Sequence, residues 1–387
     1  MVDYENDEAF WKQVREAFPL TYKRVYFNNG TFGPSPTRVL DAVKKRMDEI
    51  GVSGEYGSGD RGRTRLAEFM KVATEEIALT HSTTEGINIV TWGLPLKAGD
   101  EVLITLQEHV GNAMPWLNRA KLHGLVLKPF EPALTALENL ALIEKLITPR
   151  TRVIAIPHIT CTTGLVLPLQ EIAALARSRG IFTAIDGAHG AGALNLDLKA
   201  LGCDFYAASC HKWMLGPSST GFLYVRRELL DTLQTYWVGA NSDKGWDLYA
   251  TPVTFRGYAD SARRYDFGTS NAALYAGVEE AINFLQEIGM DKIEARVKAL
   301  AGHLQQKLLA LGRKIEMLSS TEARSRAGMI TFTIPGKDYL EFATLAAKNG
   351  FRIRAVPESN LKALRISTHI YNSMEDVDQF VAFVASV

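Results

Sequence analysis

The sequence predicts an α/β protein whose large domain holds a mostly parallel sheet of seven strands between layers of helices. Three observations indicate this fold. Short apolar runs recur between about residues 75 and 226, segments with helical apolar spacing lie between most of them, and the runs are apolar almost without interruption. Strands of that kind are buried on both faces, as in parallel sheets that helices cover on both sides.

The elements follow one another in a regular order. A helix that ends near Ile50 and a polar, glycine-rich loop at residues 51–62 precede the first strand. The segment 168–179 is typical of the connecting helices, because its apolar residues recur at i, i+3 and i+4 and Gly180 can end it. The seven predicted strands are residues 76–80, 101–106, 125–130, 152–157, 181–186, 205–209 and 221–226.

The pattern changes after about residue 275, which predicts a second, smaller α+β domain. Its predicted helices are residues 274–288, 291–311, 340–348 and 374–385, and its predicted strands are residues 329–334, 351–354 and 363–367. We therefore expect an N-terminal segment of residues 1–20 that packs with the small domain, a large domain of residues 21–274 and a small C-terminal domain of residues 275–387.

Composition excludes several classes of protein. The 387 residues are 47% hydrophobic and 22% charged, which is typical of a globular chain with enough length to bury a sizeable core. The 43 basic and 43 acidic residues cancel, so nucleic acid is not an expected partner and a small molecule is. No apolar stretch reaches the ~18 residues of a membrane helix, so no membrane association is expected.

The cysteines indicate a reducing compartment. Cys161, Cys203 and Cys210 are the three cysteines of the chain, and no C-x-x-C spacing relates them. This argues against a zinc site and against a disulfide scaffold, and it favours the cytoplasm. No metal site is expected.

Lys212 and Asp186 are the most informative residues. Lys212 follows the run 205–209 and Asp186 ends the run 181–186, so both fall at the carboxyl edge of the sheet, where α/β proteins bind ligands. Pyridoxal 5'-phosphate (PLP) needs an amine for a Schiff base and an anion beside its pyridine nitrogen. The pair predicts a PLP enzyme, although each residue alone is more typical of a solvated loop lysine or a helix-capping aspartate.

Three further features lie at the same predicted edge. The segment 81–88 opens a helix directly after a strand, and its free N–H groups and the hydroxyls of Thr83 and Thr84 suit a phosphate, with an ordinary N-cap as the alternative. His189 can touch the phenolic oxygen of the cofactor. His109 can lie flat over its ring. For both histidines, a packed core or surface side chain is the alternative.

A nicotinamide oxidoreductase is the rival from a different class. Gly57, Gly59 and Gly62 match G-x-G-x-x-G, but no buried strand precedes them, and the dinucleotide motif requires a strand, a turn and a helix in that order. A PLP-binding regulator without turnover is a further alternative. It is disfavoured because the sequence shows no basic DNA-binding region.

Several motifs occur in an order that resembles the class V aminotransferase family, which has PLP fold type I. They are residues 26–34, 83–88, 108–109 with 115–116, 186–189, 211–212 and 267–269. The family includes cysteine desulfurases, kynureninases and isopenicillin N epimerase-like proteins. The resemblance covers about residues 20–375 and implies a homodimer with shared active sites, acting at Cα or Cβ of an amino acid through an external aldimine and a quinonoid.

The resemblance also implies roles for single residues. Lys212 looks like the Schiff-base lysine, Asp186 the pyridinium partner and His109 the stacking residue. Arg365 matches the arginine that grips the substrate's α-carboxylate, a bidentate task that suits a guanidinium, and Asn29 can help it. A surface strand arginine is the alternative for Arg365. The implied cofactor-binding residues are Thr83, Thr84, His109, Asp186, His189, Ser209, His211 and Lys212, with Thr269 reaching the phosphate of the other subunit.

Departures from the family pattern narrow the expected reaction. Cysteine desulfurases place a nucleophilic cysteine on a loop before the carboxylate-binding arginine, whereas residues 354–361 of this chain contain none. We therefore expect no persulfide-forming desulfurase activity. Cys161 stands where desulfurases tend to carry Asn, and His189 replaces their usual Gln. Both differences favour the isopenicillin N epimerase-like branch, with transamination and β- or γ-elimination left open.

Overall fold

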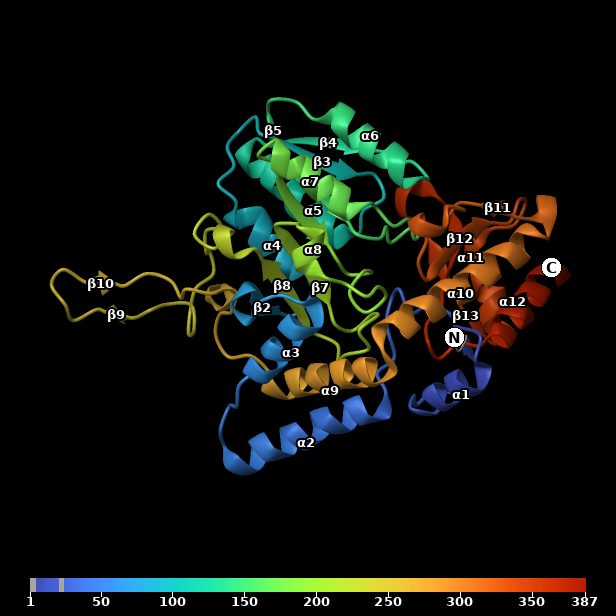
Figure 1. Cartoon of the computed structure of the whole chain (residues 1–387), viewed down its shortest axis with the longest axis horizontal. Coiled ribbons are helices and arrows are strands. Elements are labelled where there is room, and N and C mark those ends of the chain that lie inside the picture. The colour runs from blue at the N-terminus through green and yellow to red at the C-terminus, as the bar shows by residue number, and fades with distance from the viewer. Residues whose placement is uncertain (1–4, 21–23) are drawn as a thin grey trace.

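The computed structural model describes residues 5–20 and 24–387. A seven-stranded sheet forms the centre of its larger part, in the spatial order β2-β8-β7-β6-β5-β3-β4 (Figure 1). β8 runs antiparallel to both of its neighbours, and the other paired strands run parallel. The strands are β2 (Ile77–Thr80), β3 (Glu101–Thr105), β4 (Val126–Phe130), β5 (Thr151–Pro157), β6 (Phe182–Asp186), β7 (Phe205–Ser209) and β8 (Gly221–Val225).

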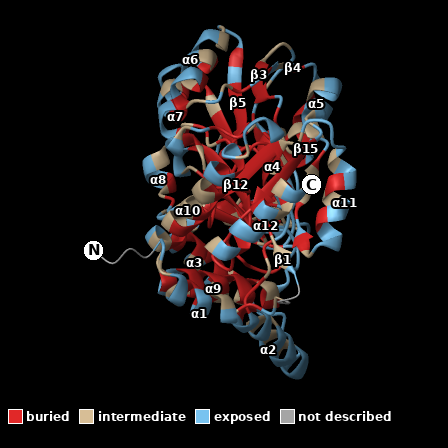
Figure 2. Cartoon of the chain, turned by 90° about the vertical axis from the view of Figure 1, so that its right-hand side faces the viewer, coloured by how far each residue is buried: buried red, intermediate tan, exposed pale blue. Residues whose placement is uncertain are grey.

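This sheet confirms the predicted fold class, and each strand begins and ends within one residue of its predicted bounds. The uninterrupted apolar runs have a direct cause, because successive residues of one strand enter two different cores. In β5, Ile154 and Ile156 pack into one apolar cluster while Val153 and Ala155 pack into the other. Both faces therefore require apolar side chains, and Figure 2 shows the buried residues concentrated along the central strands.

Helices cover both faces of the sheet. The first core receives side chains from α3 (Asp60–Met70), α6 (Ala136–Leu146), α7 (Leu169–Ser178) and α9 (Ala272–Ile288), and the second from α4 (Thr83–Gly93) and α5 (Val110–His123). α2 (Thr37–Ser53) lies along α9 (Figure 1), and α8 (Leu198–Leu201) is one short turn before β7.

The predicted loop at residues 51–62 is too long at both ends. α2 continues to Ser53 and ends at Gly54 with a left-handed φ of 70°, and α3 already begins at Asp60. The three glycines of the G-x-G-x-x-G match thus lie between two helices and in the start of the second. The dinucleotide alternative is wrong here, because its strand is missing.

A second sheet of four antiparallel strands lies in the C-terminal part, in the order β11-β12-β15-β14. α10, α11 and α12 contribute to its apolar core. The bounds are β11 (Glu316–Met317), β12 (Met329–Thr333), β14 (Arg354–Val356), β15 (Ala363–Ser367), α10 (Met290–Leu309), α11 (Tyr339–Lys348) and α12 (Met374–Ser386). The predicted single strand 351–354 is wrong, because the chain splits it. β13 (Phe351–Arg352) pairs with β1 (Val25–Tyr26), and β14 pairs with β15.

The N-terminal helix α1 (Glu8–Glu16) contacts the C-terminal helices. Oε1 of Glu8 lies 2.7 Å from Nη1 of Arg296 on α10, and Nη1 of Arg15 lies 3.2 Å from Oδ2 of Asp376 on α12. At the opposite end of Figure 1, a hairpin of β9 (Trp246–Asp247) and β10 (Thr254–Phe255) projects from the body. Within residues 5–20 and 24–387, no helix combines the length and the apolar character that crossing a membrane requires.

Candidate active site

Lys212 lies in the turn that follows β7, at the carboxyl edge of the central sheet, and it is buried. Its Nζ is 3.4 Å from Nε2 of His189, and Nε1 of Trp213 donates a hydrogen bond to Nδ1 of His189 at 3.1 Å. Burial lowers the pKa of Lys212, and it holds the pKa of His189 well below its usual range. Because Nδ1 of His189 accepts the hydrogen bond from Trp213, the neutral imidazole carries its proton on Nε2, and that proton faces Nζ of Lys212.

Asp186 ends β6, the strand beside β7. It is buried, and its Oδ1 accepts a hydrogen bond of 2.9 Å from the amide of Ala188. The turn after it is close-packed: a Cβ on Gly187 would lie 1.9 Å from the ring of Tyr206. Only glycine fits there, so the packing of this turn fixes where the Asp186 carboxylate sits.

His109 is the N-cap of α5. Its Nδ1 accepts a hydrogen bond of 3.0 Å from the amide of Gly111, which fixes the orientation of the ring. Burial lowers the pKa of His109, the charge of Lys212 lowers it further, and Asp186 opposes both. His109 thus lies in the field of Lys212 and Asp186 together, so the fold brings the three predicted groups to one place.

The start of α4 lies beside the end of β7. The amide of Thr83 donates to Oγ of Ser209 at 2.9 Å, and the two hydroxyls lie 2.8 Å apart. Thr84 is exposed, and a Cβ on Gly111 would lie 2.3 Å from its Oγ1, so the starts of α4 and α5 are close together. A helix N-terminus with three hydroxyls is a suitable place for a phosphate.

His211 adds an unsatisfied group. Its Nδ1 is buried without a hydrogen-bond partner in the described part of the chain, and its ring stacks on Phe32 with the centroids 6.3 Å apart. Burial lowers the pKa of His211 to about 4, and the charge of Lys212 acts in the same direction. A buried donor or acceptor without a partner is costly, so a ligand atom at this nitrogen would be stabilising. The residues present fit PLP: an amine, a carboxylate, a ring-facing imidazole and a phosphate cradle.

Arg365 lies on β15 and is 1% exposed, so the surface alternative is wrong. Its guanidinium donates to the carbonyl of Cys161 and, at 3.2 Å, to Oγ1 of Thr31. Burial lowers the pKa of Arg365 to about 9, and the charge of Arg354 adds to this effect. Asn29 is also buried, and its Oδ1 accepts a hydrogen bond of 3.0 Å from Tyr371. Nε of Arg365 and Nδ2 of Asn29 are buried donors without a partner among the described residues.

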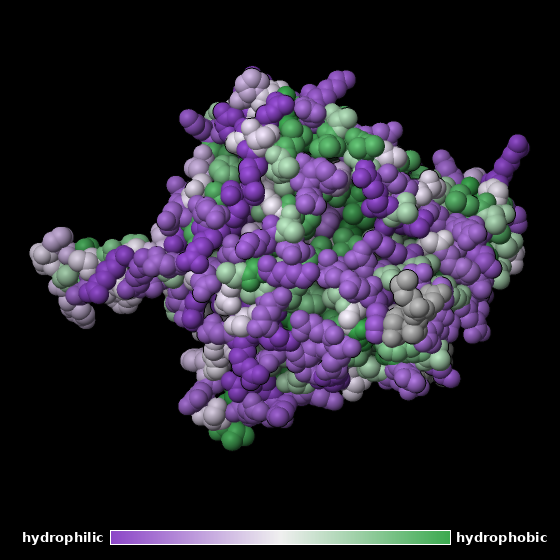
Figure 3. Space-filling model, in the orientation of Figure 1, coloured by the Kyte–Doolittle hydropathy of each residue, from purple (hydrophilic) through white to green (hydrophobic). Residues whose placement is uncertain are grey.

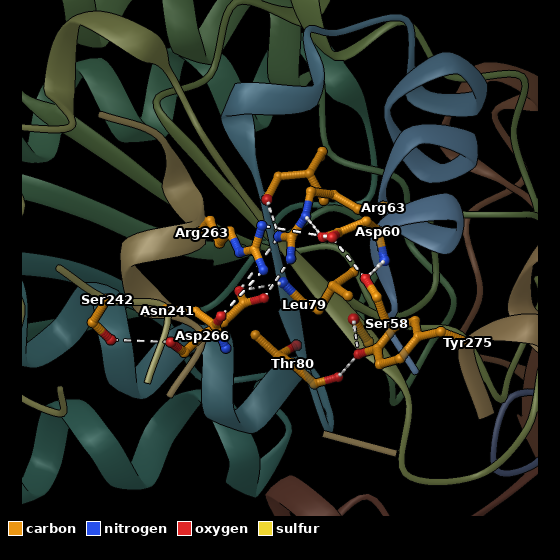
Figure 4. Close-up of polar contacts among 12 residues, drawn as sticks. Ser58, Asp60, Arg63, Leu79, Thr80, Asn241, Ser242, Arg263, Asp266 and Tyr275 are labelled. Atoms are coloured by element: carbon orange, nitrogen blue, oxygen red, sulfur yellow. Dashed lines mark hydrogen bonds and ion pairs between the residues drawn. The ribbon is translucent and has the colours of Figure 1, made fainter. Parts of the chain in front are cut away.

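Thr269 lies apart from these groups within the chain. It is exposed and lines a cavity of about 240 Å³ whose described lining includes neither Lys212 nor Asp186. The polar contacts of this cavity hold the base of the loop (Figure 4): Oδ1 of Asp266 accepts from the amide of Leu79 at 3.0 Å, and its Oδ2 pairs with Arg63. The loop that carries Thr269 is thereby fixed at an outer surface.

Sequence analysis missed the environment of Glu108. This carboxyl accepts hydrogen bonds from Oγ1 of Thr105 at 2.7 Å and from Nδ2 of Asn112 at 2.8 Å. Burial raises the pKa of Glu108 to about 8. Oδ1 of Asn112 is buried without a partner in the described residues, and a protonated Glu108 facing a reversed Asn112 amide would give it a donor. The sequence did contain a sign of this site, because the acidic Glu108 directly precedes His109 after a predicted strand.

Cys161 serves the site through its backbone. Its carbonyl accepts a hydrogen bond from Arg365, while burial raises the pKa of its thiol to about 11. A thiol with so high a pKa carries little thiolate at neutral pH and is a weak nucleophile. All three cysteines are buried and free.

Two curated relatives and one solved protein resemble the chain over nearly its whole length. A probable cysteine desulfurase of Xylella fastidiosa (strain 9a5c) is 30% identical over 409 residues, covering 97% of this chain and 95% of that protein. Isopenicillin N epimerase of Streptomyces clavuligerus is 31% identical over 388 residues, covering 96% of each. The cystine C–S lyase C-DES, solved with its product cysteine persulfide, matches with a TM-score of 0.87 and 28% identity, over 95% of this chain and 99% of C-DES.

The fold and the site define a PLP-dependent enzyme of fold type I. The Aminotransferase class-V family matches residues 58–380, and the chain belongs to this family. PLP is its cofactor, and another structure of C-DES, with a TM-score of 0.87, contains glycine covalently linked to PLP. The relatives are named for desulfuration, epimerisation and C–S cleavage, so they do not support the expected absence of persulfide chemistry.

Proposed function

We propose that this enzyme acts at Cα or Cβ of an amino acid, with an epimerisation like that of isopenicillin N epimerase as the first candidate reaction. Transamination and β- or γ-elimination are the alternatives, and the likeness to a cystine C–S lyase favours elimination among these. The observation that carries the proposal is the grouping of Lys212, Asp186 and His109 at one sheet edge, with the free donors of Arg365 and Asn29 nearby.

Each group has a task that its surroundings support. When bound, PLP supplies an electrophilic carbon for the substrate's amine and a ring that withdraws electrons from the bonds at Cα. Lys212, whose burial favours the neutral amine, holds the cofactor and then takes or returns the Cα proton. Asp186 keeps a proton on the ring nitrogen, because a buried carboxylate beside that nitrogen stabilises its charged form. His109 would stack on the ring of the bound cofactor.

The remaining residues bind two anionic groups, the phosphate of the cofactor and the α-carboxylate of the substrate. Thr83, Thr84, Ser209 and His211 hold the phosphate, and His189 donates its Nε2 proton to the phenolic oxygen. Arg365 binds the substrate's α-carboxylate through the free Nε, and Asn29 adds its free amide donor. A carboxylate there would satisfy two buried donors that otherwise lack partners.

We further propose that the enzyme does not work through a protein persulfide. The segment that precedes Arg365, residues 354–362, contains no cysteine. Cys161, Cys203 and Cys210 are buried, and burial raises the pKa of their thiols to about 11, about 12 and about 12. None of these thiols has the thiolate character that a sulfur-accepting nucleophile requires.

We also propose that two copies share their active sites, with residues 21–274 as a cofactor domain and residues 275–387 as a smaller domain in each copy. Thr269 is presented at an outer surface, where it suits the phosphate of the partner subunit. Large apolar side chains are exposed nearby in sequence, including Trp237 at 67%, Trp246 at 63% and Tyr249 at 99%. Figure 3 shows the hairpin standing out from the body, with small hydrophobic spots among hydrophilic residues. Apolar patches on a soluble surface mark interaction sites.

One experiment tests the function as a whole. The purified, PLP-loaded protein is reduced with borohydride and digested, and we expect the pyridoxyl group on Lys212. Unreduced enzyme is then screened with both enantiomers of each amino acid for changes in visible absorbance, followed by identification of products. Modification of a different lysine, or no spectral response to any amino acid, would contradict the proposal. Sulfide release with a persulfide on one of the three cysteines would contradict the proposed absence of that route.

A further inference from the structure

Arg354 is a second arginine beside the proposed carboxylate-binding residue. β14 and β15 are antiparallel neighbours, and Arg354 stands directly opposite Arg365. Residues paired in this way project from the same face of the sheet, with Cβ atoms about 4.5–5.5 Å apart. Like charges in this arrangement repel, and Arg365 is buried away from the water that would screen them. The pair therefore favours the binding of anions.

Among the residues that the structure describes, Glu358 is the only carboxylate paired with Arg354, and it neutralises this arginine only in part. Arg354 donates through Nη2 to Oε1 of Glu358. The other terminal nitrogen of Arg354, Nη1, and the other carboxylate oxygen of Glu358, Oε2, are buried without hydrogen-bond partners in the part of the chain that the structure describes. A full arginine–carboxylate pair uses two parallel hydrogen bonds. This pair has one, so Arg354 keeps a buried donor for another acceptor.

Glu358 sits at the start of a strained loop. Ser359, Asn360 and Lys362 all have left-handed backbones, with φ values of 53°, 54° and 49°. Side chains other than glycine rarely adopt that conformation, and such strain gathers at binding sites. The hydroxyl of Ser359 donates to the carbonyl of Leu106 at 2.7 Å, which ties the loop to the segment just before His109. The loop is thereby held beside the active site.

Arg354 also acts on the catalytic groups electrostatically. Burial and the charge of Lys212 lower the pKa of His109, and the charge of Arg354 adds to this effect. The same charge contributes to the lowered pKa of Lys212, behind the larger effect of burial. This agrees with the pairing of Arg354 and Arg365, which places both side chains on the same face of the sheet.

We propose that Arg354 binds a second carboxylate, carried by the substrate's side chain. When no substrate is bound, the Glu358 carboxylate pairs with Arg354 in its place. The inference rests on the proposed amino-acid chemistry and narrows it to amino acids with an acidic side chain. Arg365 takes the α-carboxylate and Arg354 the distal one. Each guanidinium then has its own counter-charge, and the repulsion across β14 and β15 is relieved.

The test compares glutamate with glutamine, which differ in charge but hardly in shape. Each is titrated into the PLP-loaded enzyme, and the dissociation constant is read from the change in visible absorbance. We expect wild type to bind glutamate at least about tenfold more tightly than glutamine, the ratio given by one charged hydrogen-bonded pair. Arg354→Gln should bring this ratio to about one while glutamine binding stays nearly unchanged.

The variant Glu358→Gln shows whether Arg354 recognises the substrate's carboxylate or only forms a structural ion pair with Glu358. If Glu358 competes with the substrate for Arg354, its neutralisation should strengthen glutamate binding several-fold, the opposite of Arg354→Gln. If the ion pair only shapes the loop, both variants should weaken glutamate and glutamine alike, and the proposal fails. Arg352→Gln, an exposed arginine two residues away, is the matched control and should leave the ratio unchanged. Visible spectra before titration show whether each variant keeps its cofactor.

The outcomes also distinguish this inference from the proposed function. A wild-type enzyme that responds to glutamine or alanine without preferring glutamate or its one-carbon homologues overturns the dicarboxylate inference alone. A PLP-loaded enzyme that responds to no amino acid overturns both.

Discussion

Asp186 ends β6 and Glu108 follows β3, on either side of β5 at the same edge of the sheet, and the surroundings of the two carboxyl groups differ. Asp186 receives the amide of Ala188 and faces the site of the cofactor ring, whereas Glu108 is enclosed by Thr105 and Asn112. Burial raises the pKa of Glu108 to about 8, which favours its neutral form. We therefore expect separate tasks for the two groups, an electrostatic one toward the cofactor for Asp186 and a structural one for Glu108.

Asp186→Asn tests the electrostatic task. An amide cannot stabilise a protonated ring nitrogen as a carboxylate does, so removal of the Cα proton should slow. Loss of ~2 kcal/mol of charge-assisted bonding corresponds to at least about a tenfold decrease in rate. Exchange of an α-deuterium from the substrate measures this step, with cofactor content checked in parallel. Asp197→Asn, which retains a helix-capping side chain, is the control. An unchanged exchange rate would remove Asp186 from the mechanism.

Glu108→Gln tests the second group through the pH dependence of stability. The folded protein keeps a proton on Glu108 up to about pH 8, whereas the unfolded chain releases it near pH 4.5. The free energy of unfolding therefore falls as pH rises through this window, by on the order of a few kcal/mol. Glutamine cannot ionise, so the variant should gain stability relative to wild type between pH 5 and pH 8. Thermal unfolding of both proteins at pH 5 and pH 8 measures the difference. If wild type and variant change in stability by the same amount between these pH values, Glu108 does not have a raised pKa in the folded protein.

At the residue scale, sequence reasoning found groups whose position follows from a strand end. Lys212, Asp186 and His109 each follow or end a buried strand, so a parallel sheet necessarily brings them to one edge. The sequence alone could not predict the hydrogen-bond donors and acceptors that lie in loops outside the helices and strands. The carbonyl of Cys161 and the hydroxyl of Thr31 contact Arg365 only because residues far apart in sequence meet, and no local pattern encodes that meeting.

At the scale of elements, the start of α4 is the proposed phosphate site. Thr83 there contacts Ser209 at the end of β7, so one helix and one strand jointly position the hydroxyls. The prediction of this element from sequence succeeded because an N-cap serine and a following polar turn mark a helix start. The split of residues 351–356 between two sheets was missed, since both pieces have the same apolar character and differ only in their partners.

Thr83→Val tests this element. The substitution keeps the shape and removes one hydroxyl, so PLP should bind about tenfold more weakly, while pyridoxal, which lacks the phosphate, should bind as before. Fluorescence titration of the apoenzyme with each vitamer gives the two dissociation constants. Thr91→Val is the control on the same helix, because Oγ1 of Thr91 is buried without a partner in the described residues. An equal loss for both vitamers would indicate damage to the fold and not to the phosphate site.

At the scale of the whole molecule, the exposed parts bear on the proposed dimer. Lys212, Asp186 and Ser209 are buried within the chain, whereas Thr269 is exposed. The β9–β10 hairpin projects from the body (Figure 1). Asp266 and Arg63 hold the base of the Thr269 loop through a contact of 2.5 Å. A second copy that receives this loop would complete the phosphate site.

Thr269→Ala tests the shared site. A phosphate carries about two negative charges at neutral pH, and in a partly buried cleft it needs several donors. Loss of one hydroxyl from across the dimer should therefore increase cofactor release on dialysis by several-fold, whereas Thr344→Ala, an exposed threonine on α11, should not. The same model makes cofactor retention depend on protein concentration, because dilution to monomers removes the contact. Sedimentation that shows a monomer with full cofactor content and full activity would exclude shared active sites.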